Sequence, residues 1–151
     1  MFDLSGRLLN EKSGIQTIAA ASSTRIGSFM DAELLQGADG KHAQAVFEIL
    51  DGADTVSRSF VYFEAAKNLA WTDPRLAWSF ARTPAGYDIT LKAESAARGV
   101  WIDVGSLAAQ VSDNAFDMIG GERVTVHITT TASLAVLRKV LRVRSYFASA
   151  T

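Results

Sequence analysis

The sequence predicts an all-β protein built as an immunoglobulin-like antiparallel β-sandwich, with an additional partial sandwich on its N-terminal side. Three observations predict this class. Several segments alternate apolar and polar residues with a period of two. Clusters rich in Gly, Asn, Asp and Pro separate these segments at sandwich-like spacing. The alternation of strand and helix patterns that a parallel sheet needs is missing.

In the first half of the chain, four strands and one helical turn are expected. The strands are Phe2–Leu9, Gly14–Ala21, Ala45–Leu50 and Ser57–Glu64. The clusters "DLSG", "NEKSG" and "LDGAD" supply turn chemistry between them. In "MDAELLQG", Asp31 is expected to cap a single helical turn that Gly37 ends.

In the second half, strands are expected in "YDITLKAE", "RGVWIDVG" and "ERVTVHITT", with turns at "TPAGYD" and "IGGE". In the middle strand, Val100 and Ile102 share the core face and Trp101 alternates away from it. In "SLAVLRKVL", Ser133 is expected to cap a short helix, whose apolar face carries Leu134, Leu137 and Leu141.

A break in "NLAWTDPRLAW", which contains Pro74, divides the chain near its middle. We therefore expect a partial immunoglobulin-like module at residues 1–72 and a C-terminal sandwich domain at residues 73–151. Because a complete immunoglobulin sandwich takes about 100 residues, the first module is expected to lack its opening strands. We expect the chain to be a piece of a longer protein.

Composition excludes several functional classes. The net charge of -1 argues against nucleic acid as the main partner, because phosphate binding needs a concentrated basic surface. No apolar run reaches the roughly 20 residues of a membrane span, and the first residues, "MFDLSGRLLNEKSG", lack the basic start and apolar core of a signal peptide. The 151 residues include no cysteine, which excludes disulfides and thiolate metal sites. These features leave both a cytoplasmic and an exported location open.

One local charge imbalance stands out. Residues 134–151 carry four basic side chains and no acidic one. Such a short run is typical of a solvated face, with a docking patch as the alternative. The four residues are Arg138, Lys139, Arg142 and Arg144.

The stretch "SDNAFDMIGGE" is either a ligand loop or a structural corner. Its acidic residues lack the spacing of a calcium loop. Asp113 and Asn114 are instead expected to bond nearby backbone amides, with Phe116 as an apolar plug. Gly121 and Glu122 then turn the chain into the next strand. We expect neither a metal nor a cofactor.

Residues suited to catalysis also have plainer interpretations. Carboxylates within strand-like runs are by default solvated, and both histidines look like surface residues. "GADG" lacks the Lys-Ser/Thr of a phosphate loop. The carboxylates are Glu48, Glu64, Glu94 and Asp103, and the histidines are His42 and His127.

The tryptophans suggest carbohydrate binding as an alternative function. Trp71, Trp78 and Trp101 are candidates for a sugar-stacking platform. Trp101 and Trp78 are the two candidate carbohydrate contacts, and Trp101 fits best because it alternates outward. The plainer interpretation is that Trp101 packs under a neighbouring strand or module.

Taken together, "ARGVWIDVG", "SDNAFDMIGGE" and "SLAVLRKVLRVRSY" resemble the C-terminal end of glycoside hydrolase family 2 β-mannosidases. That family has patterns of the type A-R-x-V-W-[LI]-D and S-D-N-x-F-D-L-[LI]-P-G-E. Upstream, "FDLSGRLL", "LDGADTVSRSFVYFEAAKNLAW" and "DPRL" are similar to the preceding module, so the resemblance covers essentially the whole chain. Gly120 stands where the family usually has Pro, which is expected to loosen the corner.

The resemblance implies a non-catalytic role. In this family a β/α barrel outside the matching region carries both catalytic carboxylates, and β-sandwich modules surround it. The parent would release terminal β-linked mannose with retention, whereas this chain alone is expected to be inactive. Its expected partners are the barrel and the other domains of the parent. A homo-oligomer through exposed strand edges is a further expectation.

Overall fold

The structure is a computed structural model and describes residues 1–150. The chain divides into two compact units. The first comprises Met1–Asp3 and Arg7–Ala70, and the second comprises Leu4–Gly6 together with the chain from Trp71 onward. All strand pairs are antiparallel among the described residues. This confirms the all-β, immunoglobulin-like class.

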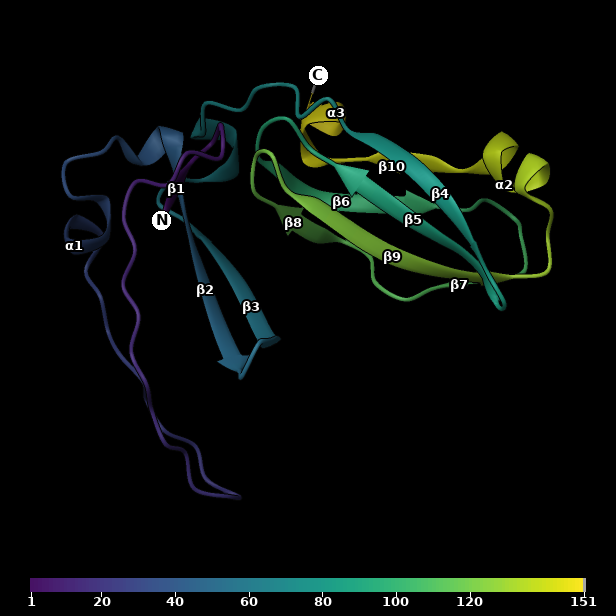
Figure 1. The fold of residues 1–151 in the computed structure, drawn as a ribbon. Helices are drawn as coiled ribbons and strands as arrows, with labels where there is room; N and C mark the ends of the chain where they lie inside the picture. Colours follow the sequence, from purple (N-terminus) through teal and green to yellow (C-terminus); the bar gives the residue numbers. More distant parts are fainter. Residues whose placement is uncertain (151) are drawn as a thin grey trace. The chain divides into compact units, whose positions relative to one another are not determined.

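The second unit is a sandwich of two sheets (Figure 1). One sheet has the strand order β4-β5-β9-β7 and the other β10-β6-β8. The strands are β4 (Ala77–Thr83), β5 (Gly86–Lys92), β6 (Ala97–Asp103), β7 (Ala109–Val111), β8 (Phe116–Met118), β9 (Arg123–Thr130) and β10 (Arg142–Arg144). Of these, β4, β7, β8 and β10 have no counterpart among the strands expected from alternation.

The core of the second unit lies between these sheets, and the period-two pattern explains it. Ile89 pairs with Val126 across β5 and β9, and both side chains are buried. Val100 and Ile102 of β6 are buried from the other sheet. Burying one such side chain fully stabilises the fold by about 1.5–3 kcal/mol. The alternating strands therefore supply most of the interior.

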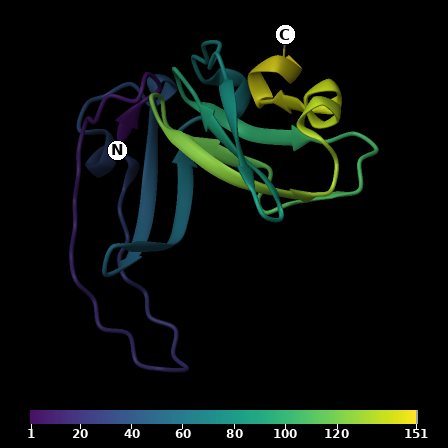
Figure 2. The ribbon, with the colours of Figure 1, turned by 45° about the vertical axis from the view of Figure 1, so that its right-hand side comes forward.

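Helix α2 (Leu134–Val140) closes one end of this core and confirms the expected cap. The Ser133 hydroxyl accepts a hydrogen bond from the Val136 amide at 3.4 Å. Leu137 and Leu141 are both buried in the core cluster, and Leu134 packs against it. Figure 2 shows α2 (yellow) beyond the end of β9. The short helix α3 (Tyr146–Ala150) follows β10.

The first unit has a single three-stranded sheet in the described part of the chain, with the order β1-β2-β3. Its strands are β1 (Phe2–Asp3), β2 (Ala43–Asp51) and β3 (Asp54–Tyr62). A tight turn at Gly52, with φ of 63°, joins β2 to β3. Five large apolar side chains of this hairpin remain exposed: Phe47, Ile49, Leu50, Val56 and Val61. Short 3-10 turns occupy Gly40–His42 and Ala66–Asn68.

Three expectations for the first unit are wrong. Gly14–Ala21 forms no strand, because no segment among residues 1–150 pairs with its backbone, and each of its residues is exposed. Phe2–Leu9 keeps only β1 and an isolated bridge between Phe2 and Leu8. Helix α1 (Asp31–Leu35) is capped by Met30 rather than Asp31.

The α1 termini explain the shifted cap. The Glu33 carboxylate accepts a hydrogen bond from the Met30 amide at 3.0 Å, so the reach-back bond comes from the third helical residue. Gln36, with φ of 48°, and Gly37, with φ of 88°, end the helix in the left-handed region. No helix among residues 1–150 is long and apolar enough to cross a membrane.

Candidate functional site

Asn114 lies at the corner after β7 and acts as a side-chain partner for β6. Its Oδ1 accepts a hydrogen bond from the Ile102 amide at 2.7 Å, and its Nδ2 donates to the Ile102 carbonyl at 2.9 Å. An amide side chain thereby makes both bonds that a neighbouring strand would otherwise make. The corner thus continues the β10-β6-β8 sheet where β8 itself does not reach.

The corner's carboxylates also turn towards backbone amides. Asp117 accepts from the Gly99 amide at 2.7 Å, and Glu122 accepts from the Ile119 amide at 2.8 Å. Asp113 accepts from the Asn114 amide at 2.7 Å. No group of three or more His, Cys, Asp or Glu residues that could hold a metal occurs in the described residues. Each of these oxygens therefore helps to fix a backbone bend.

The apolar residues of the corner point to the core. Phe116 is half-buried against the core cluster, and Met118 is completely buried. Gly121 has φ of 80°, a conformation that side-chain-bearing residues rarely adopt, and its amide donates to the Ala93 carbonyl at 2.8 Å. The polar and apolar residues together give this stretch the features of a folded corner.

Gly120, where the resembled family usually has Pro, meets the segment Leu4–Gly6 of the same unit. The Ala96 amide donates to the Leu4 carbonyl at 2.7 Å, and the Leu4 side chain is buried. A Cβ added to Gly120 would overlap the Ser5 carbonyl, and one added to Gly6 would overlap the Gly120 carbonyl. Close backbone approach therefore gives both positions a reason to be glycine.

His127 and Asp88 form an exposed pair on the outer face of the four-stranded sheet, with 2.6 Å between Nδ1 and Oδ1. Ser112 lies nearby, but its hydroxyl accepts from the His127 main-chain amide at 2.9 Å. This bond holds the hydroxyl in the strand ladder rather than against the imidazole, so the three residues lack the alignment of a nucleophile and its base. His42 lies 3.9 Å from Asp39 in the first unit.

The remaining carboxylates have local partners. Glu48 pairs with Arg58 at 3.3 Å. Asp103 accepts from the Gly105 amide at 2.7 Å. The other two lie outside the strands: Glu94 pairs with Arg75 at 3.5 Å, and Glu64 accepts from Asn68 at 3.5 Å.

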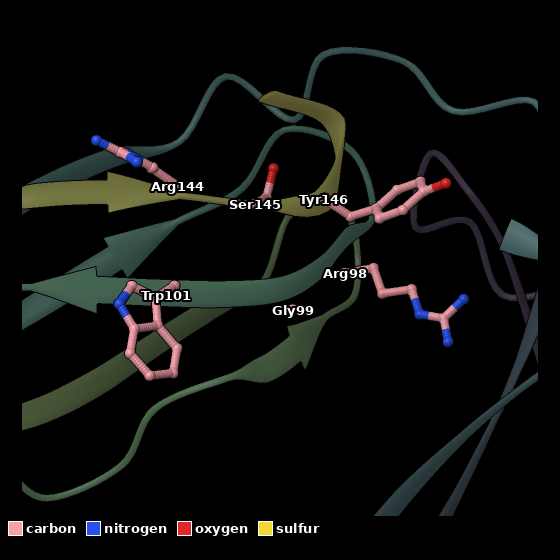
Figure 3. Close-up of a pocket in the computed structure, with 6 residues that line it drawn as sticks. All are labelled: Arg98, Gly99, Trp101, Arg144, Ser145 and Tyr146. Atoms are coloured by element: carbon pink, nitrogen blue, oxygen red, sulfur yellow. The ribbon is translucent and has the colours of Figure 1, made fainter. Parts of the chain in front are cut away.

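Trp101 lines an open depression on the outer face of the β10-β6-β8 sheet. Its side chain is 51% exposed, as the alternation of β6 predicts. Gly99 and Ser145 lie in the middle, and four larger side chains surround them (Figure 3). The depression has a volume of about 390 Å³. Its residues are Arg98, Gly99, Trp101, Arg144, Ser145 and Tyr146.

The structure does not bring Trp78 to this depression. Trp78 pairs with Leu91 across β4 and β5, so it lies on the core face of the other sheet. It is 41% exposed because β4 is an edge strand. The Trp71 ring lies tilted against that of Tyr146, with ring centroids 6.2 Å apart and an interplanar angle of 54°.

Sequence reasoning missed the neighbours of Trp101. Arg144 belongs to the basic run noted above, but no sequence signal placed it opposite Trp101. Tyr146 was not singled out. The register of β10 on β6 brings Arg144 opposite Trp101, and Tyr146 follows β10 at the start of α3.

Two family models match the chain. A model described as a mannosidase Ig/CBM-like domain matches residues 1–68. A model described as an Ig-fold domain, with the name Ig_mannosidase, matches residues 71–149, more than half of the chain. No match was found among curated proteins.

Proposed function

The chain belongs to the family of mannosidase Ig-fold domains, and from this premise we propose that it is a non-catalytic β-sandwich region of a β-mannosidase. Its parent would hydrolyse terminal β-linked mannose of oligosaccharides through a covalent intermediate, with retention of configuration. Both catalytic carboxylates would belong to a β/α barrel elsewhere in the parent. The role of this region would be to support that barrel.

The use of the corner's oxygens carries this proposal. A retaining glycosidase needs two carboxyl groups about 5–5.5 Å apart that flank the scissile bond and can reach the sugar. Here Asp117 and Glu122 accept from main-chain amides of their own unit. A carboxylate engaged in this way stabilises a bend, and the same stretch places Met118 in the core. These hydrogen bonds support a structural rather than a catalytic role for its acidic groups.

The proposed partners are the barrel and the other domains of the parent. The exposed apolar side chains of the β2–β3 hairpin, among them Phe47, Ile49 and Val61, are the surface that we propose such a domain covers. Strand β3 lies at the edge of its sheet, so pairing with a second copy is the alternative for this surface.

The first experiment measures hydrolysis of an aryl β-mannoside by the purified chain. We expect no turnover above that of buffer. Turnover that survives repurification and disappears in Asp117→Asn or Glu122→Gln would contradict the proposal. Far-UV circular dichroism of both variants separates loss of a catalyst from loss of the fold.

A second experiment tests the supporting role directly. A parent β-mannosidase that lacks this region should unfold at a lower temperature than the intact enzyme. Adding the chain in trans should recover part of the difference. An enzyme whose thermal unfolding and activity are unchanged by the deletion would argue against support of the barrel.

The exposure of Trp101 in an open depression favours a second candidate function, the binding of carbohydrate. An indole face packs well against the apolar face of a sugar ring. Titration with manno-oligosaccharides, followed by tryptophan fluorescence, separates the candidates. A saturable change that Trp101→Ala removes supports binding, and a flat titration leaves the supporting role alone.

A further inference from the structure

We propose that the depression around Trp101 binds a pyranose that bears a carboxylate, with the indole stacked on the sugar ring and Arg144 paired with the carboxylate. This deepens the sugar-binding candidate above and rests on it. It adds a chemical class of ligand, a uronic acid unit, and a residue that selects it.

Strand register places the two main side chains together. Arg144 of β10 lies directly opposite Trp101 of β6, and the next pair along is Val143 opposite Ile102. Ile102 is buried, so Trp101 and Arg144 share the outer face. Directly opposed residues of an antiparallel pair have Cβ atoms about 5 Å apart. An indole and a guanidinium therefore border the same space.

The floor of the depression is left open by Gly99. The register of β6 on β8 shifts between Ala97 and Val100, and Gly99 lies within this irregularity with φ of 57°. A Cβ placed on Gly99 would meet no atom within 4 Å. The space above this residue is therefore large enough for a ligand to approach the backbone. Arg98 and Tyr146 lie on the side away from Trp101 (Figure 3).

The charge of the depression favours an anion. Its lining contains two arginines and no acidic residue. The Asp117 carboxylate, which is not part of this lining, accepts a hydrogen bond from the Gly99 amide at 2.7 Å. The two arginines of β10 differ in their cross-strand partners. Arg142 is opposite the acidic Asp103, whereas Arg144 is opposite the neutral Trp101.

Arg144 is consequently the arginine of β10 that is best placed for a ligand. Arg142 also donates to the Lys139 and Leu141 carbonyls at 3.0 and 2.8 Å. No hydrogen bond or ion pair joins the Arg144 side chain to another residue in the described part of the chain. A planar guanidinium pairs with a carboxylate through two parallel hydrogen bonds, which gives direction as well as charge. A carboxylated pyranose could therefore stack its ring on Trp101 and pair its carboxylate with Arg144.

The test uses the whole chain and three probes. The first is an oligomannuronate, which has both ring and carboxylate. The second is a neutral manno-oligosaccharide of the same length, and the third is acetate. The readout is the ¹⁵N–¹H signal of each tryptophan indole, with calorimetry for the affinity. We expect oligomannuronate to shift the Trp101 signal and to leave the Trp78 signal in place.

Variants assign the roles. Trp101→Ala should abolish binding of oligomannuronate. Arg144→Gln should weaken it at least about tenfold, the effect expected for losing one charge-assisted hydrogen-bonded pair. Arg144→Lys should recover only part of this loss, because lysine keeps the charge without the planar fork. Trp78→Ala and Arg142→Gln are the matched controls and should leave the affinity within about twofold.

The outcomes are distinguishable. Equal affinity for the neutral and charged oligosaccharides, with loss in Trp101→Ala, would retain sugar binding and overturn the carboxylate inference. Acetate binding as tightly as oligomannuronate would overturn the role of the ring. No binding of any probe would overturn both sugar-binding statements, while the supporting role would be judged by the deletion experiment above.

Discussion

The two units of this chain bury their apolar residues to very different extents. In the second unit two sheets face each other, and strand alternation leads to side chains such as Leu91 with 0% exposure. In the first unit one three-stranded sheet has no facing sheet among the described residues, and Ile49 of β2 is 45% exposed. Similar strand patterns thus yield a core only where a second layer covers them.

The largest expected effect is a core truncation in the second unit. Leu91→Ala should lower the free energy of unfolding by about 3 kcal/mol, because it removes buried methyl groups and leaves a cavity. The matched change Ile49→Ala in the first unit should cost less than about 1 kcal/mol. Hydrogen exchange of β5 and β2 amides in a urea series measures the two units separately. Equal losses would remove the contrast between them.

The next largest loss of stability is expected at the corner of the second unit that contains Asn114. Asn114→Ala removes both side-chain bonds to Ile102, so a partly buried amide and carbonyl lose their partners. We expect a loss of about 2 kcal/mol in stability. Asp113→Ala, which removes a single exposed hydrogen bond to the Asn114 amide, is the control and should cost less, about 0.5–1 kcal/mol. Chemical denaturation of the three proteins provides the comparison, and an equally mild Asn114→Ala would show that the corner is held by other contacts.

A smaller loss of stability is expected where the Gly120 backbone meets Ser5. Gly120→Ala should cost about 1–2 kcal/mol, because its Cβ forces the Ser5 backbone to move. Gly14→Ala in the first unit, where a Cβ meets no atom within 4 Å, should have little effect. Thermal unfolding of the two variants checks the difference. A neutral Gly120→Ala would mean that Leu4–Gly6 yields without strain.

The smallest effect on stability is expected for a substitution in the exposed β2–β3 hairpin. The same substitution should have a larger effect on self-association of the chain. Val61→Lys on the edge strand β3 should change the free energy of unfolding by less than about 0.5 kcal/mol. It should also reduce self-association of the chain, since a charge blunts an open edge. Val136→Lys, an exposed site on α2, is the control. Sedimentation velocity at high concentration reads the result, and a monomeric wild-type chain would count against self-association.

The strands with regular alternation were predictable from sequence, because each places its apolar residues on one covered face. In β9, Val126 and Ile128 are buried while His127 is exposed. Ser133 predicted the start of α2 by the same local logic. In contrast, β7 and β8 have three residues each, too few to show a period. The strand expected at Gly14–Ala21 fails because pattern alone does not provide a pairing partner.

The candidate site was predictable only in part. Outward alternation singles out Trp101 from the sequence, and residue chemistry singles out Asn114 and Glu122 as turn-forming. The pairing of Arg144 with Trp101 depends on how β10 lies on β6, a register that joins segments far apart in the chain. The same holds for Trp78, whose position depends on its pairing with Leu91. Local patterns cannot specify such pairings.

The segment Leu4–Gly6 has a consequence for how this protein is made. The Leu4 carbonyl accepts a hydrogen bond from the Ala96 amide, and the neighbouring Ser5 meets Gly120, so segments far apart in the sequence lie in contact. These contacts close very long loops, and topologies dominated by such contacts fold slowly. During synthesis the second unit would wait, with its earliest residues unplaced, until the glycine pair at 120–121 has emerged.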